Sequence, residues 1–70
     1  MTAIEKALHA MDEAARHGND EARDLARRAW DEFDRARDFR KIRNQHPVAK
    51  SAHAKGARLL RKAESALSPQ

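Results

Sequence analysis

Two short breaks divide this chain into three segments in which apolar residues recur every three or four positions. The first break is Gly18-Asn19, and the second runs from Asn44 to Pro47. Apolar residues with this spacing line one face of an α-helix, and Gly and Pro commonly end helices. Fifteen alanines, together with the absence of Tyr and Cys, also favour helix over sheet. We therefore expect an all-α fold in a single domain, residues 1–70, because a chain of this length is too short for two domains.

Residues at the predicted helix ends have the chemistry that helix ends require. Thr2 and Glu5 have the spacing of a capping box. Gly18 suits the left-handed position that follows a helix, and Asn19 suits the N-cap of the next one. Pro47 is favoured at the first position of a helix. These signals predict helices over about residues 3–17, 20–44 and 47–67, followed by a frayed end.

The Gly18-Asn19 break predicts a tight antiparallel hairpin between two helices of unequal length. At 1.5 Å per residue, the first helix is about 22 Å long and the second about 37 Å. The first helix therefore covers the second only to about residue 34 or 35. Phe39 and Ile42 lie beyond that point, so they need the third helix or another chain to cover them.

The third predicted helix carries two small residues, Ala52 and Gly56, on its apolar stripe. One interpretation is that they form a notch where another helix approaches closely. The other is that Gly56 simply weakens this helix by about 1 kcal/mol.

The chain has few large apolar residues from which to build a core. Twelve lie inside the chain, more than half of the hydrophobic total is Ala, and the absence of Cys excludes a disulfide. Oligomerisation is the remaining common way to stabilise so small a chain. We therefore expect a homodimeric helical bundle or a tight complex with another protein. The core and dimer seam is expected to include Leu25, Ala29, Phe39, Ile42, Leu59 and Leu60.

The charge is divided between the two parts of the sequence. Residues 1–38 carry ten acidic and seven basic side chains, whereas residues 39–70 carry one acidic side chain and eight basic ones. The basic part is expected to meet an acidic partner or the acids of the second helix. For nucleic acid, the candidate residues are Arg40, Lys41, Arg43, Lys50, Arg58 and Arg61. Residues 47–70 contain no aromatic side chain to stack on bases, and no base-reading pattern is evident.

The second predicted helix contains two neighbouring aromatic residues, Trp30 and Phe33, between Arg27 and Arg37. Aromatic and Arg side chains contribute most of the binding energy in many interfaces, so these four residues form a candidate protein-binding site. The alternative is that the aromatics belong to the core or to the dimer seam. Trp30 is the better anchor, because it lies beside the main stripe of Ala and Leu.

No residue pattern indicates catalysis or a bound cofactor. His9 and Glu13 have the spacing of two metal ligands, but no third ligand lies near them in the sequence. The few hydroxyl groups have no nucleophile pattern, and so thin a chain can hardly enclose a pocket. We therefore expect no enzyme activity, metal, cofactor or small-molecule substrate. There is no run of about 18 apolar residues and no signal-peptide pattern, so we expect a cytoplasmic protein without a membrane partner.

The segment from Ala10 to Ala26 has closely spaced alanines on both sides of the Gly18-Asn19 break. It resembles the helical hairpins of many small bacteriophage proteins and one turn of a tetratricopeptide repeat, although no second copy is present. In size, basic charge and lack of Cys, the chain is similar to phage host-takeover proteins of the anti-CRISPR and anti-quorum-sensing types. The resemblance to the anti-quorum-sensing type implies a helical dimer in the host cytoplasm that blocks a host transcriptional regulator, with a pilus motor as a second target.

Three hypotheses about function follow. The first is a non-enzymatic inhibitor that sequesters a host protein through the Trp30 and Phe33 site or through the basic face of the third helix. The second is a small nucleic-acid-binding protein. The third is a structural phage component that assembles through the same seams.

Overall fold

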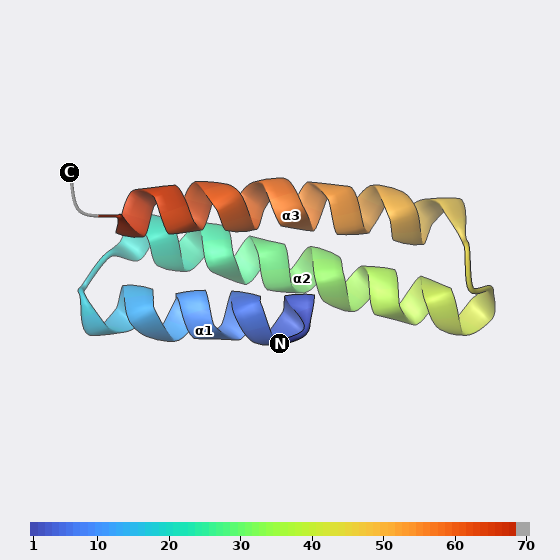
Figure 1. The fold of residues 1–70 in the computed structure, drawn as a ribbon, viewed down its shortest axis with the longest axis horizontal. Coiled ribbons are helices and arrows are strands. Elements are labelled where there is room, and N and C mark those ends of the chain that lie inside the picture. Colours follow the sequence, from blue (N-terminus) through green and yellow to red (C-terminus); the bar gives the residue numbers. More distant parts are fainter. Residues whose placement is uncertain (69–70) are drawn as a thin grey trace.

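The computed structural model describes residues 1–68 as three helices that run antiparallel to their neighbours in sequence (Figure 1). They are α1 (Ala3–Arg16), α2 (Asp20–Ile42) and α3 (Pro47–Leu67). The predicted all-α fold, a helical hairpin plus a third helix, is confirmed. The helices together measure 40 × 18 × 16 Å. Pro69 and Gln70, part of the end expected to fray, lie outside the described residues.

The α1–α2 hairpin is bounded by the predicted caps. The side chain and backbone of Thr2 form a reciprocal capping box with Glu5. The Thr2 N–H donates to the Glu5 carboxylate, which holds the pKa of that carboxyl below its ordinary value. Gly18 has a φ of 63°, the left-handed conformation that favours glycine. Asn19 caps α2 through its Oδ1, which accepts from the Ala22 N–H at 3.0 Å.

Helix bounds differ from the prediction only at two C-termini. His17 is the C-cap of α1 rather than its last helical residue. Arg43 takes an extended conformation and caps α2, which therefore ends at Ile42 instead of residue 44. The range of α3 agrees with the prediction, and its N-cap is His46, whose Nδ1 accepts from the Val48 N–H at 3.1 Å.

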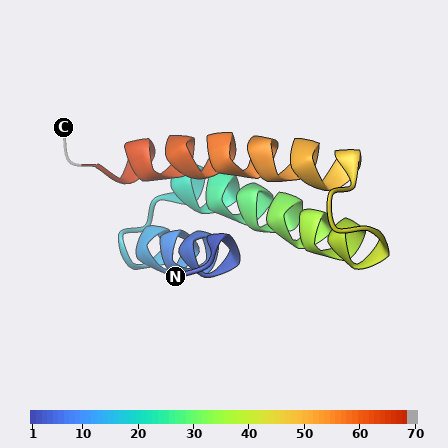
Figure 2. The ribbon, with the colours of Figure 1, turned by 45° about the vertical axis from the view of Figure 1, so that its right-hand side comes forward.

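Helix α2 forms the centre of the structure. Both α1 and α3 pack extensively on α2, whereas α1 and α3 touch each other only sparsely. Figures 1 and 2 both show that α1 covers only part of the length of α2, while α3 runs along most of it. The far end of α2 is therefore covered on one side only, as the helix lengths predict.

The core is built mainly of alanine. The large side chains among the buried hydrophobic residues are Phe33, 3% exposed, and Leu60, 7% exposed. Alanine at these positions lets the helix backbones approach closely, but each one buries little apolar area. The other buried hydrophobic residues are Ala7, Ala10, Ala14, Ala22, Ala26, Ala29, Ala36, Ala49, Ala52 and Ala63.

The notch on α3 is occupied by an aromatic ring of α2. A Cβ atom at Gly56 would lie 2.8 Å from Cε1 and 2.9 Å from Cδ1 of Phe33. The same ring lies 5.2 Å, between centroids, from the imidazole of His53. Of the two interpretations of Gly56, the notch is therefore the one that the structure supports.

The far end of α2 has a second, smaller core cluster. Phe39 packs against a cluster of Ala36, Ala49 and Ala52. Its ring lies 4.9 Å, between centroids, from that of His46, the residue before α3. Ile42, one helical turn further on, is 74% exposed. The third helix thus covers Phe39, as expected, but leaves Ile42 uncovered.

Candidate functional site

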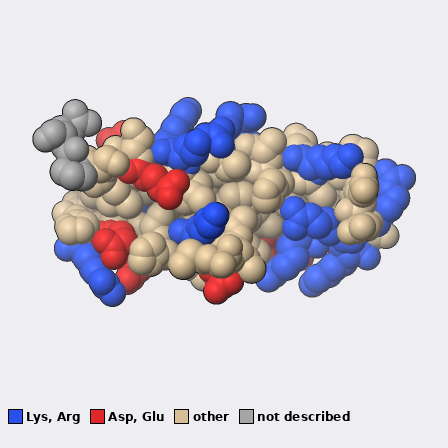
Figure 3. All heavy atoms as spheres, viewed as in Figure 1, with Lys and Arg blue, Asp and Glu red and all other residues tan. Residues whose placement is uncertain are grey.

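The eight basic residues of the C-terminal part are all exposed, and together we call them the basic surface. Figure 3 shows Lys and Arg gathered over α3 and over the end where α2 meets α3, with Asp and Glu mainly toward the other end. Every member is exposed to solvent. Its members are Arg40, Lys41, Arg43, Lys50, Lys55, Arg58, Arg61 and Lys62.

Most acidic side chains that form ion pairs are paired with bases of their own helix. Arg16 lies 2.9 Å from Asp12 on α1, and Arg28 lies 3.1 Å from Asp24 on α2. Pairs of this kind, three or four residues apart, form locally and do not depend on the fold of the whole chain. Five of the ten acidic residues of α1 and α2 are paired in this way.

Few ion pairs neutralise the basic surface. Among residues 1–68, one of its eight members forms an ion pair, Lys55 with Glu32 of α2, at 3.8 Å. Arg40 contacts a ring nitrogen of His53 at 3.3 Å, which adds no negative charge. The interpretation that the basic part answers the acids of the second helix within one chain holds only for Lys55.

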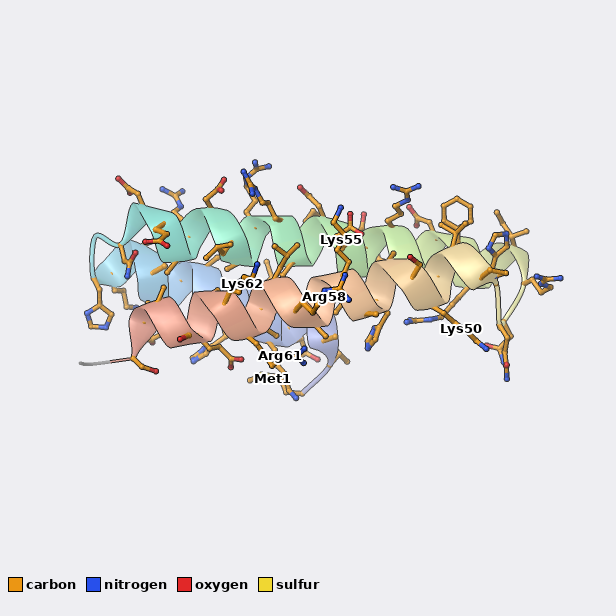
Figure 4. The ribbon with its side chains drawn as sticks, turned by 90° about the horizontal axis from the view of Figure 1, so that it is seen from above. Met1, Lys50, Lys55, Arg58, Arg61 and Lys62 are labelled. Atoms are coloured by element: carbon orange, nitrogen blue, oxygen red, sulfur yellow. The ribbon has the colours of Figure 1, made fainter. Side chains whose placement is uncertain are left out.

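On α3 the bases spread across the whole outward side. Figure 4 shows Lys55 on the side toward α2, Arg61 at the opposite edge and Arg58 between them. Lys50 and Lys62 are twelve residues apart, or about 18 Å along the helix. The other exposed residues of α3 include the small residues Ser51, Ala54 and Ser65 and the acidic Glu64, three residues after Arg61. A partner can therefore approach the helix closely between the basic side chains.

One of the four predicted protein-binding residues does not lie at the surface. Phe33 is buried against α3, so the expectation that it anchors a foreign protein is wrong. Trp30 is half-buried, and its Nε1 is buried without an acceptor among the described residues. Arg27 and Arg37 are exposed, but each pairs with acids of α2, Arg27 with Asp31 at 3.4 Å and Arg37 with Asp34.

Most of the predicted core and seam residues pack against other residues of the same chain. Ala29 and Leu60 are buried in the core, and Leu25 and Leu59 are half-buried against it. Phe39 packs on the second cluster. Ile42 is the exception, because the described residues leave it exposed.

One apolar surface was not recognised in the sequence. The spacing of Ile4, Leu8 and Met11 in the sequence predicts that they line the apolar face of the first helix, with Ala7 and Ala14 widening that face. In the structure, however, the buried residues of α1 are Ala7, Ala10 and Ala14. Leu8 is 48% exposed, and Ile4 and Met11 are half-buried. The signal that could have found this surface is a second row of apolar residues on α1, one position before the first.

A groove of about 860 Å³ lies between α1 and α3. Ala10, Phe33 and Leu60 are among its apolar residues, and it also contains His9, His17 and His53. Within residues 1–68, no three His, Asp or Glu side chains gather into a set that could hold a metal ion. No helix of this part of the chain is both long enough and apolar enough to cross a membrane.

Comparison of the chain with models of protein families, with curated proteins and with solved structures gave no match.

Proposed function

We propose that this chain is a nucleic-acid-binding protein that holds the phosphate backbone on its basic surface. The single observation that supports the proposal is the missing neutralisation of that surface. Seven of its eight members have no ion-pair partner among residues 1–68, although the chain contains eleven acidic residues. The positive charge over α3 and the neighbouring end of α2 is therefore largely unbalanced by ion pairs within the described residues.

Such a field suits a polyanion. Lys and Arg that meet phosphates release condensed counterions, and this release provides affinity without any base contact. The length of α3 between Lys50 and Lys62, about 18 Å, corresponds to about five base pairs of duplex. Helix α3 carries no Phe, Tyr or Trp to stack on bases, so the expected binding is independent of sequence.

The test is fluorescence anisotropy with a labelled duplex of about 20 base pairs at about 50 mM salt. The variant combines Arg58→Gln, Arg61→Gln and Lys62→Gln. We expect it to bind at least about tenfold more weakly than the wild type, because three phosphate contacts are lost. Gln preserves helix propensity, so circular dichroism should remain that of the wild type.

A matched control distinguishes the effect of losing bases from the basic surface from the effect of lowering the net charge. Arg16→Gln, Arg23→Gln and Arg28→Gln remove the same amount of charge from α1 and α2. This control should bind within about threefold of the wild type, because its bases lie outside the basic surface. Equal weakening of both triple variants contradicts the proposed site. Failure of the wild type to bind duplex or single strands at low salt contradicts the function and leaves an acidic protein as the partner.

Sequestration of a host protein, the other function that the sequence indicates, stays a prediction. The burial of Phe33 removes one of the two aromatic anchors on which that hypothesis depends.

A further inference from the structure

The turn between α2 and α3 forms one end of the molecule, and α1 does not extend to this end (Figure 1). Ile42, the last residue of α2, lies there and is 74% exposed. A single exposed apolar residue is common on protein surfaces and by itself indicates nothing. The residues around Ile42 are what distinguish it, because they are basic or carry side-chain amides. We call this end of the molecule the tip, and its exposed residues include Arg40, Lys41, Ile42, Arg43, Asn44 and Gln45.

The positive charge of the tip is not balanced by ion pairs. Within residues 1–68, Arg40, Lys41 and Arg43 have no ion-pair partner. The acidic residue nearest to them in the sequence is Asp38, one helical turn before Ile42 and on the same side of α2, and the next one is Glu64. A partner that covers Ile42 therefore has to supply negative charge as well as an apolar site, because the cations around this side chain lose water when it is covered.

Hydrogen bonds and ring packing hold the backbone of the tip in place. The His46 N–H donates to the Arg43 carbonyl at 3.2 Å, which closes the turn. His46 also caps α3 through Nδ1, and its ring packs on that of Phe39, which in turn packs against the second core cluster. Ile42 therefore lies on a braced backbone, and ordering it on a partner costs less entropy than ordering a residue of a loose loop.

Basic and amide side chains around an exposed Ile are typical of proteins that bind the minor groove of duplex DNA. Such proteins contact the groove with Arg, Lys, Asn or Gln, and many insert an apolar side chain such as Ile between two base pairs. Base pairs follow one another at about 3.4 Å, so a base step takes up one inserted side chain and not an extended apolar surface. A lipid surface is instead bound through the apolar face of a whole helix. Of the large apolar residues that are exposed within residues 1–68, Ile42 alone lies at the tip, which favours DNA over lipid.

We propose that Ile42 is a wedge, a side chain that the tip inserts between two base pairs of the nucleic acid on the basic surface. The inference rests on the proposed function and specifies its ligand as duplex DNA. Insertion unstacks one base step and kinks the duplex by about 20–90°. Arg40, Lys41 and Arg43 contact phosphates beside that step, and these contacts offset the cost of unstacking.

The test compares two labelled DNA duplexes of about 20 base pairs by fluorescence anisotropy at about 50 mM salt. One duplex is fully paired, and the other has a central mismatch, which lowers the cost of opening that step. We expect the wild type to bind the mismatched duplex at least about fivefold more tightly than the paired one. Ile42→Ala should bind the two duplexes within about twofold of each other, since it retains the cations but has no wedge. Energy transfer between dyes at the two ends of the paired duplex should rise with the wild type and not with Ile42→Ala, because only the wild type kinks the duplex.

Leu8→Ala is the matched control, because Leu8 is also an exposed apolar residue but lies on α1, outside the basic surface. This variant should keep both the preference for the mismatched duplex and the kink. Salt-dependent binding by the wild type with neither the preference nor the kink overturns the wedge and leaves the proposed function intact. An unchanged preference in Ile42→Ala, or its equal loss in Leu8→Ala, also overturns the wedge. Failure of the wild type to bind either duplex contradicts both proposals, and binding to vesicles of anionic lipid that Ile42→Ala abolishes then assigns the tip to a lipid surface.

Discussion

Replacing Gly56 by Ala tests how closely α2 and α3 approach each other. In an ordinary helix interior this change stabilises a protein by about 1 kcal/mol, because Gly is a poor helix former. Here the new Cβ would lie 2.8 Å from Cε1 of Phe33, well inside ordinary van der Waals contact. The ring has little room to move, since Phe33 is 3% exposed.

Two opposing effects determine how much Gly56→Ala changes the free energy of unfolding. Extra methyl groups forced into a packed core typically cost about 1–3 kcal/mol. Subtracting the gain in helix propensity leaves a net loss of about 0–2 kcal/mol in the free energy of unfolding. For a domain of this size, a loss of 1 kcal/mol lowers the Tm by about 4–8 °C.

The decisive comparison repeats the substitution in a Phe33→Leu background. Leu has neither Cε1 nor Cζ, so most of the collision disappears while the propensity gain stays. We expect Gly56→Ala to stabilise that background by about 0.5–1 kcal/mol, a change of sign from the wild-type background.

Urea denaturation followed by circular dichroism measures all four proteins of this cycle. One fixed protein concentration is used throughout, because the apparent stability of a protein that self-associates depends on concentration. A Gly56→Ala variant that gains about 1 kcal/mol in both backgrounds refutes the reasoning, since the ring and the glycine would then not be in contact.

Two further predictions concern the helix ends. Asn19 caps α2 and also donates from Nδ2 to the Ala66 carbonyl of α3 at 3.0 Å, so Asn19→Ala should lose about 1–3 kcal/mol of unfolding free energy. Asn19→Asp keeps an acceptor for the Ala22 N–H, so in urea denaturation its stability should fall between that of Asn19→Ala and that of the wild type. Equal losses for the two variants contradict a role for the cap. Because the folded pKa of Glu5 is lowered, its carboxylate stabilises α1 above its unfolded pKa, and this contribution is lost as pH falls through the folded pKa. Glu5→Gln keeps a neutral partner for Thr2. In thermal denaturation at decreasing pH, the wild type should therefore lose its stability advantage over Glu5→Gln. An advantage that does not change with pH contradicts the stabilising role of the Glu5 carboxylate.

Local signals in the sequence account for the helix order and most of the helix ends. Gly18, Asn19 and Pro47 each act through the backbone of their immediate neighbours, so their roles can be inferred without knowledge of the fold. The end of α2 was placed two residues too far, because the extended conformation of Arg43 belongs to the turn and has no distinct residue signal.

The rotation of α1 could not be inferred in the same way. Its two apolar rows are one residue apart, which is only 100° around the helix, and periodicity alone favours the row with the larger side chains. The alanine row turns inward in the structure. Close packing against the alanines of α2 determines that choice, and a pattern confined to one helix does not contain it.

The candidate sites also depend on contacts between helices that a pattern within one helix does not contain. The sequence locates the basic residues and the local ion pairs of α2, but only the fold shows that a single member of the basic surface, Lys55, pairs with an acid within residues 1–68. Burial of Phe33 depends on Gly56, which lies more than twenty residues further along the chain. The notch could be recognised from the sequence, but not the side chain that occupies it.

The salt dependence of duplex binding by the wild-type chain tests the role of the basic surface most directly. If five to seven of its members meet phosphates, the logarithm of the association constant should fall with the logarithm of salt concentration at a slope of about −4.5 to −6.3. Removing Arg58, Arg61 and Lys62 should make that slope shallower by about 2.7. A slope near zero, or one that the three substitutions leave unchanged, contradicts phosphate binding by this surface.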